Sequence, residues 1–322
     1  MRSLRNPRHL LLLAGAASIG AALSLAIDGL DELVDVLVWF PLAALLYATF
    51  IDVDLGALGR ALRDEQFLIA SLGANFVIVP FVVAVLVSPL SAYPALQLGT
   101  AMVLLVPCTD WFSTFTRIGG GDVRRAIAIT PLQLVAQLLL LPIYLRLIVG
   151  DVVEDRLDAE PFLVAFGAVI LLPLVLAALT RRALISTGRE GWMDGITGAV
   201  PYLLAITLLL VAASQAPAVV DAGVGLFRVA VIVIAYAVLA LLIARLVARV
   251  VHLDVPGRRT LAYNIGTRNS FVVLPLALAL PADLQPAAAA IALQSIIELA
   301  AMLAYLYAVP LFVFPGRGFE ME

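Results

Sequence analysis

The sequence predicts an all-α integral membrane protein with ten transmembrane helices, arranged as two inverted five-helix repeats in which helices four and nine are broken. Three observations support this prediction. The 322-residue chain is 63% hydrophobic and 13% charged, whereas a soluble domain is nearer half apolar and a quarter charged. Apolar runs of membrane-spanning length follow one another, with basic and acidic connections in alternation. Two of these runs are interrupted at matching places in the two halves of the chain.

The spans follow from length, since about twenty apolar residues cross a bilayer core. The runs are Leu10–Ala26, Leu33–Ile51, Phe67–Val87, Leu96–Ile118, Val123–Val149, Phe162–Thr180, Ile196–Ala213, Val224–Val251, Arg259–Leu280 and Pro286–Phe314. Met1–Leu13 begins like a signal peptide but lacks a cleavage site, so we expect an uncleaved first span. The short connections predict one transport domain over residues 1–322, with a first repeat at 1–150 and an inverted repeat at 151–322. Five spans in each half make the second half enter from the opposite side.

The basic residues are all arginines, and they occupy every second connection. They are Arg2, Arg5 and Arg8, then Arg60 and Arg63, Arg117, Arg124 and Arg125, Arg181, Arg182 and Arg189, Arg245, Arg249, Arg258 and Arg259, and Arg317. The other connections are acidic, with only Arg146, Arg156 and Arg228 on their side. The positive-inside rule therefore predicts a multi-pass protein of the cell membrane with both termini in the cytoplasm.

The first interruption follows Val106 in the fourth span. Pro107 removes a backbone donor and kinks the helix beside Cys108, which is the only cysteine in the chain. Cys108 can be a soft ligand for a thiophilic metal or metalloid, or a small buried hydrophobe. Asp110 is a site residue, one half of a structural ion pair, or a residue close to the cytoplasmic surface. Hydroxyls that can bind a substrate, or bond within their own helix, belong to Thr109, Ser113, Thr114 and Thr116.

The second interruption lies in the ninth span, before Pro275. Arg268 is the costliest residue there, because a central arginine costs roughly 2.5–3.5 kcal/mol on the insertion scale. Its guanidinium can bind an oxyanion or a carboxylate in two-point fashion, or it can form an internal salt bridge with Asp110 or Glu298. Donors and acceptors for an unwound backbone come from Asn264, Thr267, Asn269 and Ser270.

Glu298 stands well inside the last span, one helical turn after Gln294. Apolar surroundings favour the uncharged acid, so Glu298 can carry a proton, or it can be a fixed partner of Arg268. Other polar residues of the spans can line the same cavity, although interhelical hydrogen bonds are the simpler role for each. These residues are Asn75, Thr130, Gln133 and Gln137.

Together these residues resemble the bile acid:sodium symporter superfamily over essentially the whole chain. Pro107-Cys108-Thr109 is similar to the Pro-Cys-Thr of its arsenite-efflux branch, the arsenical-resistance carriers, and Glu298 matches a glutamate in their last span. The segment Arg268–Pro275 resembles bacterial members described as arsenic-resistance or bile-acid-symporter-like proteins. This resemblance implies a secondary transporter that exports arsenite or a similar small oxyanion in exchange for protons.

The chain departs from the family pattern in two respects. Sodium-coupled members place a glutamate and a glutamine, four residues apart, on sodium in the ninth span, where this chain has Asn264 and Arg268. A fixed cation there would repel Na⁺. Arsenite carriers have a further glutamate where this chain has Val272, and an apolar continuation where it has Asp110-Trp111. These departures bear on the substrate and on the coupling ion.

Three hypotheses follow for the function. In the first, Cys108 contacts arsenite, Arg268 supplies charge, and Glu298 or Asp110 handles protons. In the second, a sodium-coupled symporter imports an organic anion, whose carboxylate Arg268 binds. The third, a receptor that has kept the fold, is disfavoured because no sensory domain is present. We expect no enzyme activity, cofactor, metal site or nucleic-acid partner. The expected partners are the lipid bilayer, a small anionic or metalloid substrate, and H⁺ or Na⁺. The sequence leaves open both a monomer and a homo-oligomer.

Overall fold

The computed structural model describes residues 37–51, 64–109, 111–150, 171–221 and 223–316, together with positions 15, 16, 18–20, 22–24, 26, 34 and 167. Within these residues the protein is helical and contains no β-strand. The helices are α3 (Trp39–Phe50), α5 (Glu65–Gly73), η3 (Ala74–Ile78), α6 (Val79–Val87), η4 (Ser88–Leu90), α7 (Pro94–Leu105), α8 (Trp111–Ile118), α9 (Val123–Ile148), α12 (Leu172–Ser186), α13 (Gly191–Gly198), α14 (Val200–Asp221), α15 (Gly223–Val250), α16 (Val255–Gly266), α17 (Ser270–Leu278), η6 (Ala282–Leu284), α18 (Pro286–Ala308) and η7 (Val309–Val313).

Five helical stretches of the described chain are long and apolar enough to cross a membrane. They are Glu65–Leu90, Val123–Ile148, Gly191–Ala213, Gly223–Val250 and Pro286–Val313. The prediction of an all-α membrane protein is therefore confirmed. The ten-span count and the inverted repeats stay predictions, because the expected first span, Leu10–Ala26, and much of the sixth, Phe162–Thr180, lie outside the described residues.

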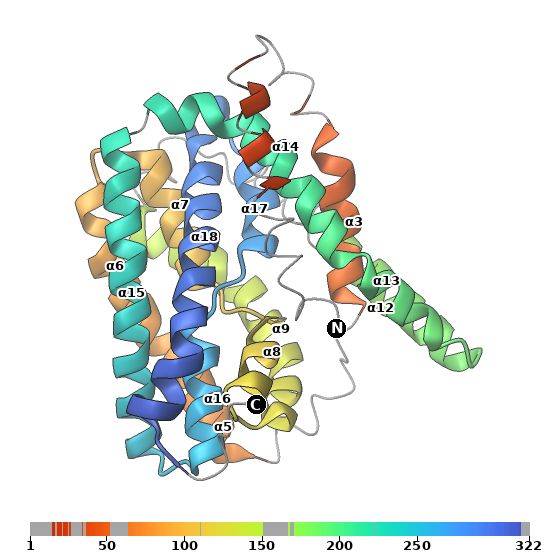
Figure 1. The fold of residues 1–322 in the computed structure, drawn as a ribbon, viewed down its shortest axis with the longest axis vertical. Coiled ribbons are helices and arrows are strands. Elements are labelled where there is room, and N and C mark those ends of the chain that lie inside the picture. The colour runs from red at the N-terminus through yellow and green to blue at the C-terminus, as the bar shows by residue number, and fades with distance from the viewer. Residues whose placement is uncertain are drawn as a thin grey trace.

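The described helices form two groups, which Figure 1 shows. We call α3, α12, α13 and α14 the lateral group, in which α12 and α14 both pack against α3. We call α5 to α9 and α15 to α18 the crossing group, because it contains the two interrupted helices that meet each other. The two groups meet where α14 contacts α18 and where α17 contacts α3.

Two helices extend beyond the ends that hydropathy predicts. The sixth span is predicted to end at Thr180, but α12 continues to Ser186 and includes Arg181 and Arg182. The seventh is predicted to end at Ala213, but α14 continues to Asp221. Hydropathy marks where a chain leaves the bilayer, whereas a helix ends only where its backbone hydrogen bonds end. The polar residues at both places are therefore helical.

A π-helical turn, η3, interrupts the long helix Glu65–Leu90 and carries Asn75. Pro80 follows it and has no N–H to donate to the carbonyl four residues earlier, that of Phe76. The Tyr144 hydroxyl of α9 donates a hydrogen bond to that carbonyl instead. Turns of this type are frequent at functional sites, and here the turn places a buried amide inside the crossing group.

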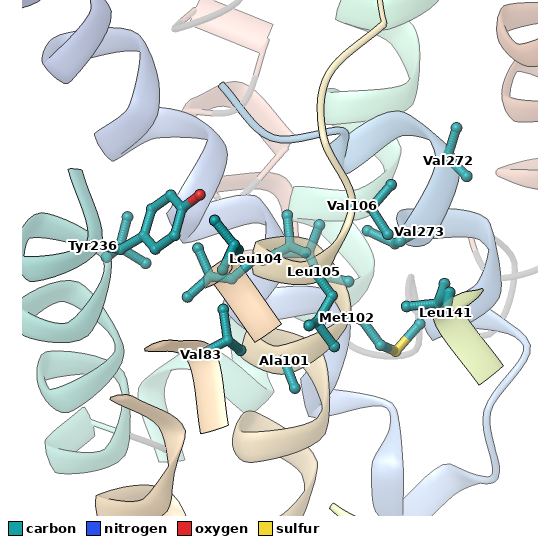
Figure 2. Close-up of a cluster of buried hydrophobic side chains, with 14 of the residues drawn as sticks. Val83, Ala101, Met102, Leu104, Leu105, Val106, Leu141, Tyr236, Val272 and Val273 are labelled. Carbon is teal, nitrogen blue, oxygen red and sulfur yellow. The ribbon is translucent and has the colours of Figure 1, made fainter. Parts of the chain in front are cut away.

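Close backbone contact brings α7 against α18. A Cβ atom at Gly99 would lie 2.3 Å from the carbonyl oxygen of Ala287, so only glycine fits there. Small residues allow helices in membranes to approach in this way. At the end of α7, an apolar layer that includes Met102, Leu105 and Val106 packs with Leu141 of α9 and Val273 of α17 (Figure 2). This layer surrounds the point where two interrupted helices meet.

Candidate functional site: a crossing of two interrupted helices

The two interruptions lie side by side. The first separates α7 from α8 and the second separates α16 from α17. Pro107 and Arg268 form an isolated antiparallel bridge. The Cys108 N–H donates to the Thr267 carbonyl at 3.2 Å, and the Asn269 N–H donates to the Val106 carbonyl at 2.8 Å. The breaks therefore satisfy part of each other's backbone, as irregular segments at membrane depth require. Segments about 160 residues apart in sequence build one site, which we call the crossing.

The Arg268 side chain lies within an oxygen cage at this crossing. It is 2% exposed. Its Nη1 donates to the Leu104 carbonyl at 3.2 Å. Its Nη2 donates to Asn75 Oδ1 at 2.8 Å and to the carbonyls of Asn264, at 3.3 Å, and Ile265. Three of these four oxygens belong to the C-terminal turns of α7 and α16, where carbonyls have no helical partner. We call these four oxygens the cage.

The cage stabilises the positive charge of Arg268 with dipoles. The carbonyl ends of two helices each carry partial negative charge, which favours a cation. The Tyr236 ring adds to this, with its centroid 5.2 Å from the guanidinium carbon. Among the described residues no carboxylate lies within ion-pairing distance of Arg268. Glu298 accepts a hydrogen bond from the backbone N–H of Arg268 at 3.0 Å instead. The salt bridge to Glu298 that the sequence allowed is therefore not formed, and Asp110 lies outside the described residues.

Asn264 is the centre of a buried hydrogen-bond network beside the cage. Its Oδ1 accepts from Ser71 Oγ at 2.8 Å, from Asn75 Nδ2 at 2.8 Å and from Gln133 Nε2 at 3.0 Å. Its Nδ2 donates to Gln133 Oε1 at 2.9 Å. The expected interhelical roles of Asn75 and Gln133 are thus confirmed. Our sequence reasoning missed Ser71, although it precedes Asn75 by one helical turn on an otherwise apolar stretch.

This network predicts a difference between two buried amides. Replacing Asn264 by leucine removes the acceptor of the Ser71 hydroxyl and the donor to Gln133 Oε1, and it takes one of two acceptors from Asn75 Nδ2 and from Gln133 Nε2. Each unsatisfied buried group costs about 1–3 kcal/mol. Gln137 provides a matched control, because both polar atoms of its buried amide lack a hydrogen-bond partner. We expect Asn264→Leu to lower the melting temperature of the purified protein markedly and Gln137→Leu to leave it unchanged or raise it. Equal melting temperatures for the two variants would contradict the network's role.

Polar groups at the starts of α8 and α17 form the other side of the crossing. Cys108 is buried, and its Sγ accepts a hydrogen bond from the Trp111 N–H at 3.3 Å. Asn269 caps α17, because its Oδ1 accepts from the Val272 N–H at 3.3 Å. The Asn269 Nδ2 donates to Thr109 Oγ1 at 3.2 Å, which joins the two helix starts. The crossing thus has carbonyl ends around Arg268 and N–H ends near Cys108.

A hydrogen-bonded chain connects Glu298 to the middle of the second interruption and to the start of α17. The Ser270 hydroxyl donates to Gln294 Oε1 at 3.0 Å, and Gln294 Nε2 donates to Glu298 Oε2. The same Glu298 oxygen accepts from the backbone N–H of Arg268. A change in the charge of Glu298 therefore acts directly on the geometry of the break.

The remaining predicted hydroxyls differ in their surroundings. Ser113 is half-buried on α8. Thr116 is fully buried on the same helix, and its hydroxyl has no hydrogen-bond partner. The Thr130 hydroxyl donates to the Ala126 carbonyl of its own helix at 2.9 Å and lies 3.3 Å from the Thr109 carbonyl. Pro107 stands at its break as predicted, whereas Pro275 lies within α17.

Interrupted helices whose ends meet inside an apolar bundle are typical of secondary transporters. The family model described as Sodium Bile acid symporter family matches residues 39–222, which include the first interruption and end before α15. The chain belongs to the sodium bile acid symporter family and is a multi-pass membrane transporter. No curated protein shows a significant match to the sequence. The superfamily predicted from the sequence is therefore confirmed.

Proposed function

We propose that this protein is a secondary active transporter that exports arsenite or a similar small oxyanion in exchange for protons and does not require sodium. The cage around Arg268 is the observation that carries this proposal. The arginine pattern supports a location in the cell membrane with both termini in the cytoplasm.

Sodium independence follows from what the cage contains. Carbonyls at unwound helix ends are the groups that coordinate Na⁺ in many transporters. Here three such carbonyls and the Asn75 amide oxygen already bind a guanidinium, whose charge is permanent. At about 4 Å and an effective dielectric near 20, a second cation would be opposed by roughly 4 kcal/mol. That energy corresponds to nearly three decades of affinity. The tethered cation thus takes the place of a dissociable one.

Proton coupling is supported by Glu298. Its carboxylate accepts hydrogen bonds from the Arg268 N–H and from Gln294. Bonds to a charged acceptor are roughly twice as strong as neutral ones, so protonation loosens both contacts. Because Gln294 also holds Ser270, a proton on Glu298 alters the contacts of the second interruption at Arg268 and at the start of α17. Binding and release of a proton at Glu298 can in this way be coupled to a conformational change of the carrier.

A thiophilic substrate is supported by the position of Cys108. Its Sγ lies against the first N–H of α8, where the helix dipole favours a thiolate. Thiolate sulfur is the side-chain ligand best suited to soft metals and metalloids. An oxyanion at the same place is also favoured by the N–H ends of α8 and α17. The substrate therefore belongs on the Cys108 side of the crossing, away from the cage.

The test is uptake into everted membrane vesicles, which reports export from cells. Arsenite and a panel of organic anions are supplied with or without a pH gradient. We expect arsenite uptake driven by the pH gradient. Uptake of an organic anion into right-side-out vesicles that needs Na⁺ would instead support the second candidate, a sodium-coupled importer, which the family name favours.

Glu298→Gln is expected to separate exchange from proton coupling. Glutamine imitates the protonated acid and cannot change charge. We expect uptake driven by a pH gradient to be lost, while exchange of labelled for unlabelled arsenite continues across the membrane. Glu65→Gln, at an exposed position on α5, is the matched control and should behave like the wild type. Gradient-driven uptake that survives in Glu298→Gln would remove Glu298 from the proton pathway.

A further inference from the structure

Two aromatic side chains stand at the starts of the two half-helices. Trp111 is the first residue of α8, and Phe271 is the second residue of α17. Their ring centroids are 6.2 Å apart and the ring planes are inclined by 46°. Offset and tilted arrangements of this kind are attractive for aromatic pairs. The pair therefore bridges the two N–H ends of the crossing.

The pair faces the lateral group. Both side chains pack against a small apolar cluster that is separate from the main core and includes Leu45 of α3 and Leu204 and Ala205 of α14. Trp111 and Phe271 are partly exposed. The polar residues next to them are covered, since Cys108, Thr109 and Asn269 are 2%, 4% and 1% exposed. The two rings thus separate the N–H side of the crossing from the interface between the helix groups.

We infer that Trp111 and Phe271 form an aromatic cover over the N–H side of the crossing, and that this cover restricts the carrier to substrates of a few atoms. The inference rests on the proposed function for the identity of the substrate side. A small oxyanion passes the rings after minor side-chain rotation. A large amphipathic organic anion requires both rings to leave the space that they fill between α14 and the crossing. The cover is therefore a determinant of specificity, and neither ring is a ligand.

The rate at which the Cys108 thiol is alkylated measures how well this cover excludes reagents. Cys108 is the only cysteine in the chain, and its Sγ lies 3.3 Å from the backbone nitrogen of Trp111. Purified protein in liposomes is treated with a charged maleimide, and alkylation of the thiol is followed by intact-protein mass spectrometry. We expect the double variant Trp111→Ala/Phe271→Ala to react about tenfold faster than the wild type, because thiol reactivity depends on access.

Phe115→Ala is the matched control. The Phe115 ring lies 6.3 Å from Trp111, but it belongs to the main core and not to the cluster at the interface. We expect this variant to react at the wild-type rate. If the double variant fails to fold, Trp111→Leu and Phe271→Leu replace it, each with a smaller increase in rate. Unchanged rates in folded variants, or an equal increase in Phe115→Ala, would overturn the cover.

A bulky probe tests the size limit. Taurocholate is expected to slow alkylation of Cys108 in the double variant and to leave the wild-type rate unchanged. Protection of wild-type Cys108 by taurocholate would overturn the restriction to small substrates. Alkylation requires no transport, so this result is independent of the proposed function. Fast alkylation in the double variant without arsenite transport by the wild type would retain the cover and refute the proposed substrate.

Discussion

Replacing Cys108 by serine is expected to abolish arsenite export while the protein remains folded and present at its normal level. Thiolate sulfur binds soft metalloids far better than a hydroxyl does. The change in packing is small, because serine is nearly the same size and can accept the hydrogen bond from the Trp111 N–H. Export is measured as arsenite uptake into everted vesicles, with protein level and melting temperature determined on the same preparation.

Ser88→Ala is the control for this variant, since Ser88 is an exposed serine of η4 whose hydroxyl donates to the Val85 carbonyl. It should retain most of the export. Wild-type export by Cys108→Ser would show that the cysteine is only a small buried hydrophobe. The remaining parts of the proposal, namely Glu298 and the cage, would then concern a substrate that is not thiophilic.

Replacing Arg268 by glutamine is expected to weaken anion transport and to create a response to Na⁺. Without the guanidinium, the carbonyls of Leu104 and Asn264 lose their donor from the arginine side chain, while the Ile265 carbonyl keeps the hydrogen bond from the Tyr236 hydroxyl. Each unsatisfied group costs about 1–3 kcal/mol, so the variant should melt at a lower temperature in K⁺. A cation that enters the cage should restore part of this loss. At a concentration one hundred times its Kd, a ligand stabilises a protein by about 2.7 kcal/mol.

The measurement is thermal unfolding of the purified protein in NaCl and in KCl at one pH. Wild type should unfold at the same temperature in both salts, and Arg268→Gln should unfold at a higher temperature in NaCl. Arg228→Gln is the control, because Arg228 is an arginine of α15 that contacts Tyr93 and the Pro89 carbonyl, far from the crossing in sequence. A Na⁺ response in wild type, or none in Arg268→Gln, would refute the replacement of a dissociable cation by Arg268.

Much of the crossing could be predicted from residue types alone. Pro107 beside a polar run, and Arg268 in an apolar one, conflict with an unbroken span, and such conflicts indicate where helices must open. That the two openings meet follows from the cost of unsatisfied backbone in a membrane. The residues that build the cage could not be predicted this way. Three of the four oxygens are main-chain carbonyls, and any residue type carries one.

The hydrogen-bond partner of Glu298 could not be predicted from the sequence either. A carboxylate and an arginine in neighbouring spans suggest a salt bridge, but Glu298 binds the backbone of Arg268 while the guanidinium points to the cage. The choice depends on which way one side chain turns at a helix end. The aromatic cover could not be predicted for a similar reason, because Trp111 and Phe271 are brought together only when the two breaks pair.

The most direct test of the proposal replaces Na⁺ by K⁺ at constant pH during transport by the wild-type protein. Arsenite uptake into everted vesicles is recorded in both salts, and again after a protonophore has collapsed the pH gradient. The caged guanidinium predicts equal uptake in Na⁺ and K⁺ and loss of uptake with the gradient. Uptake that collapses in K⁺ would show that the carrier depends on sodium despite Arg268, and the proposed mechanism would fail.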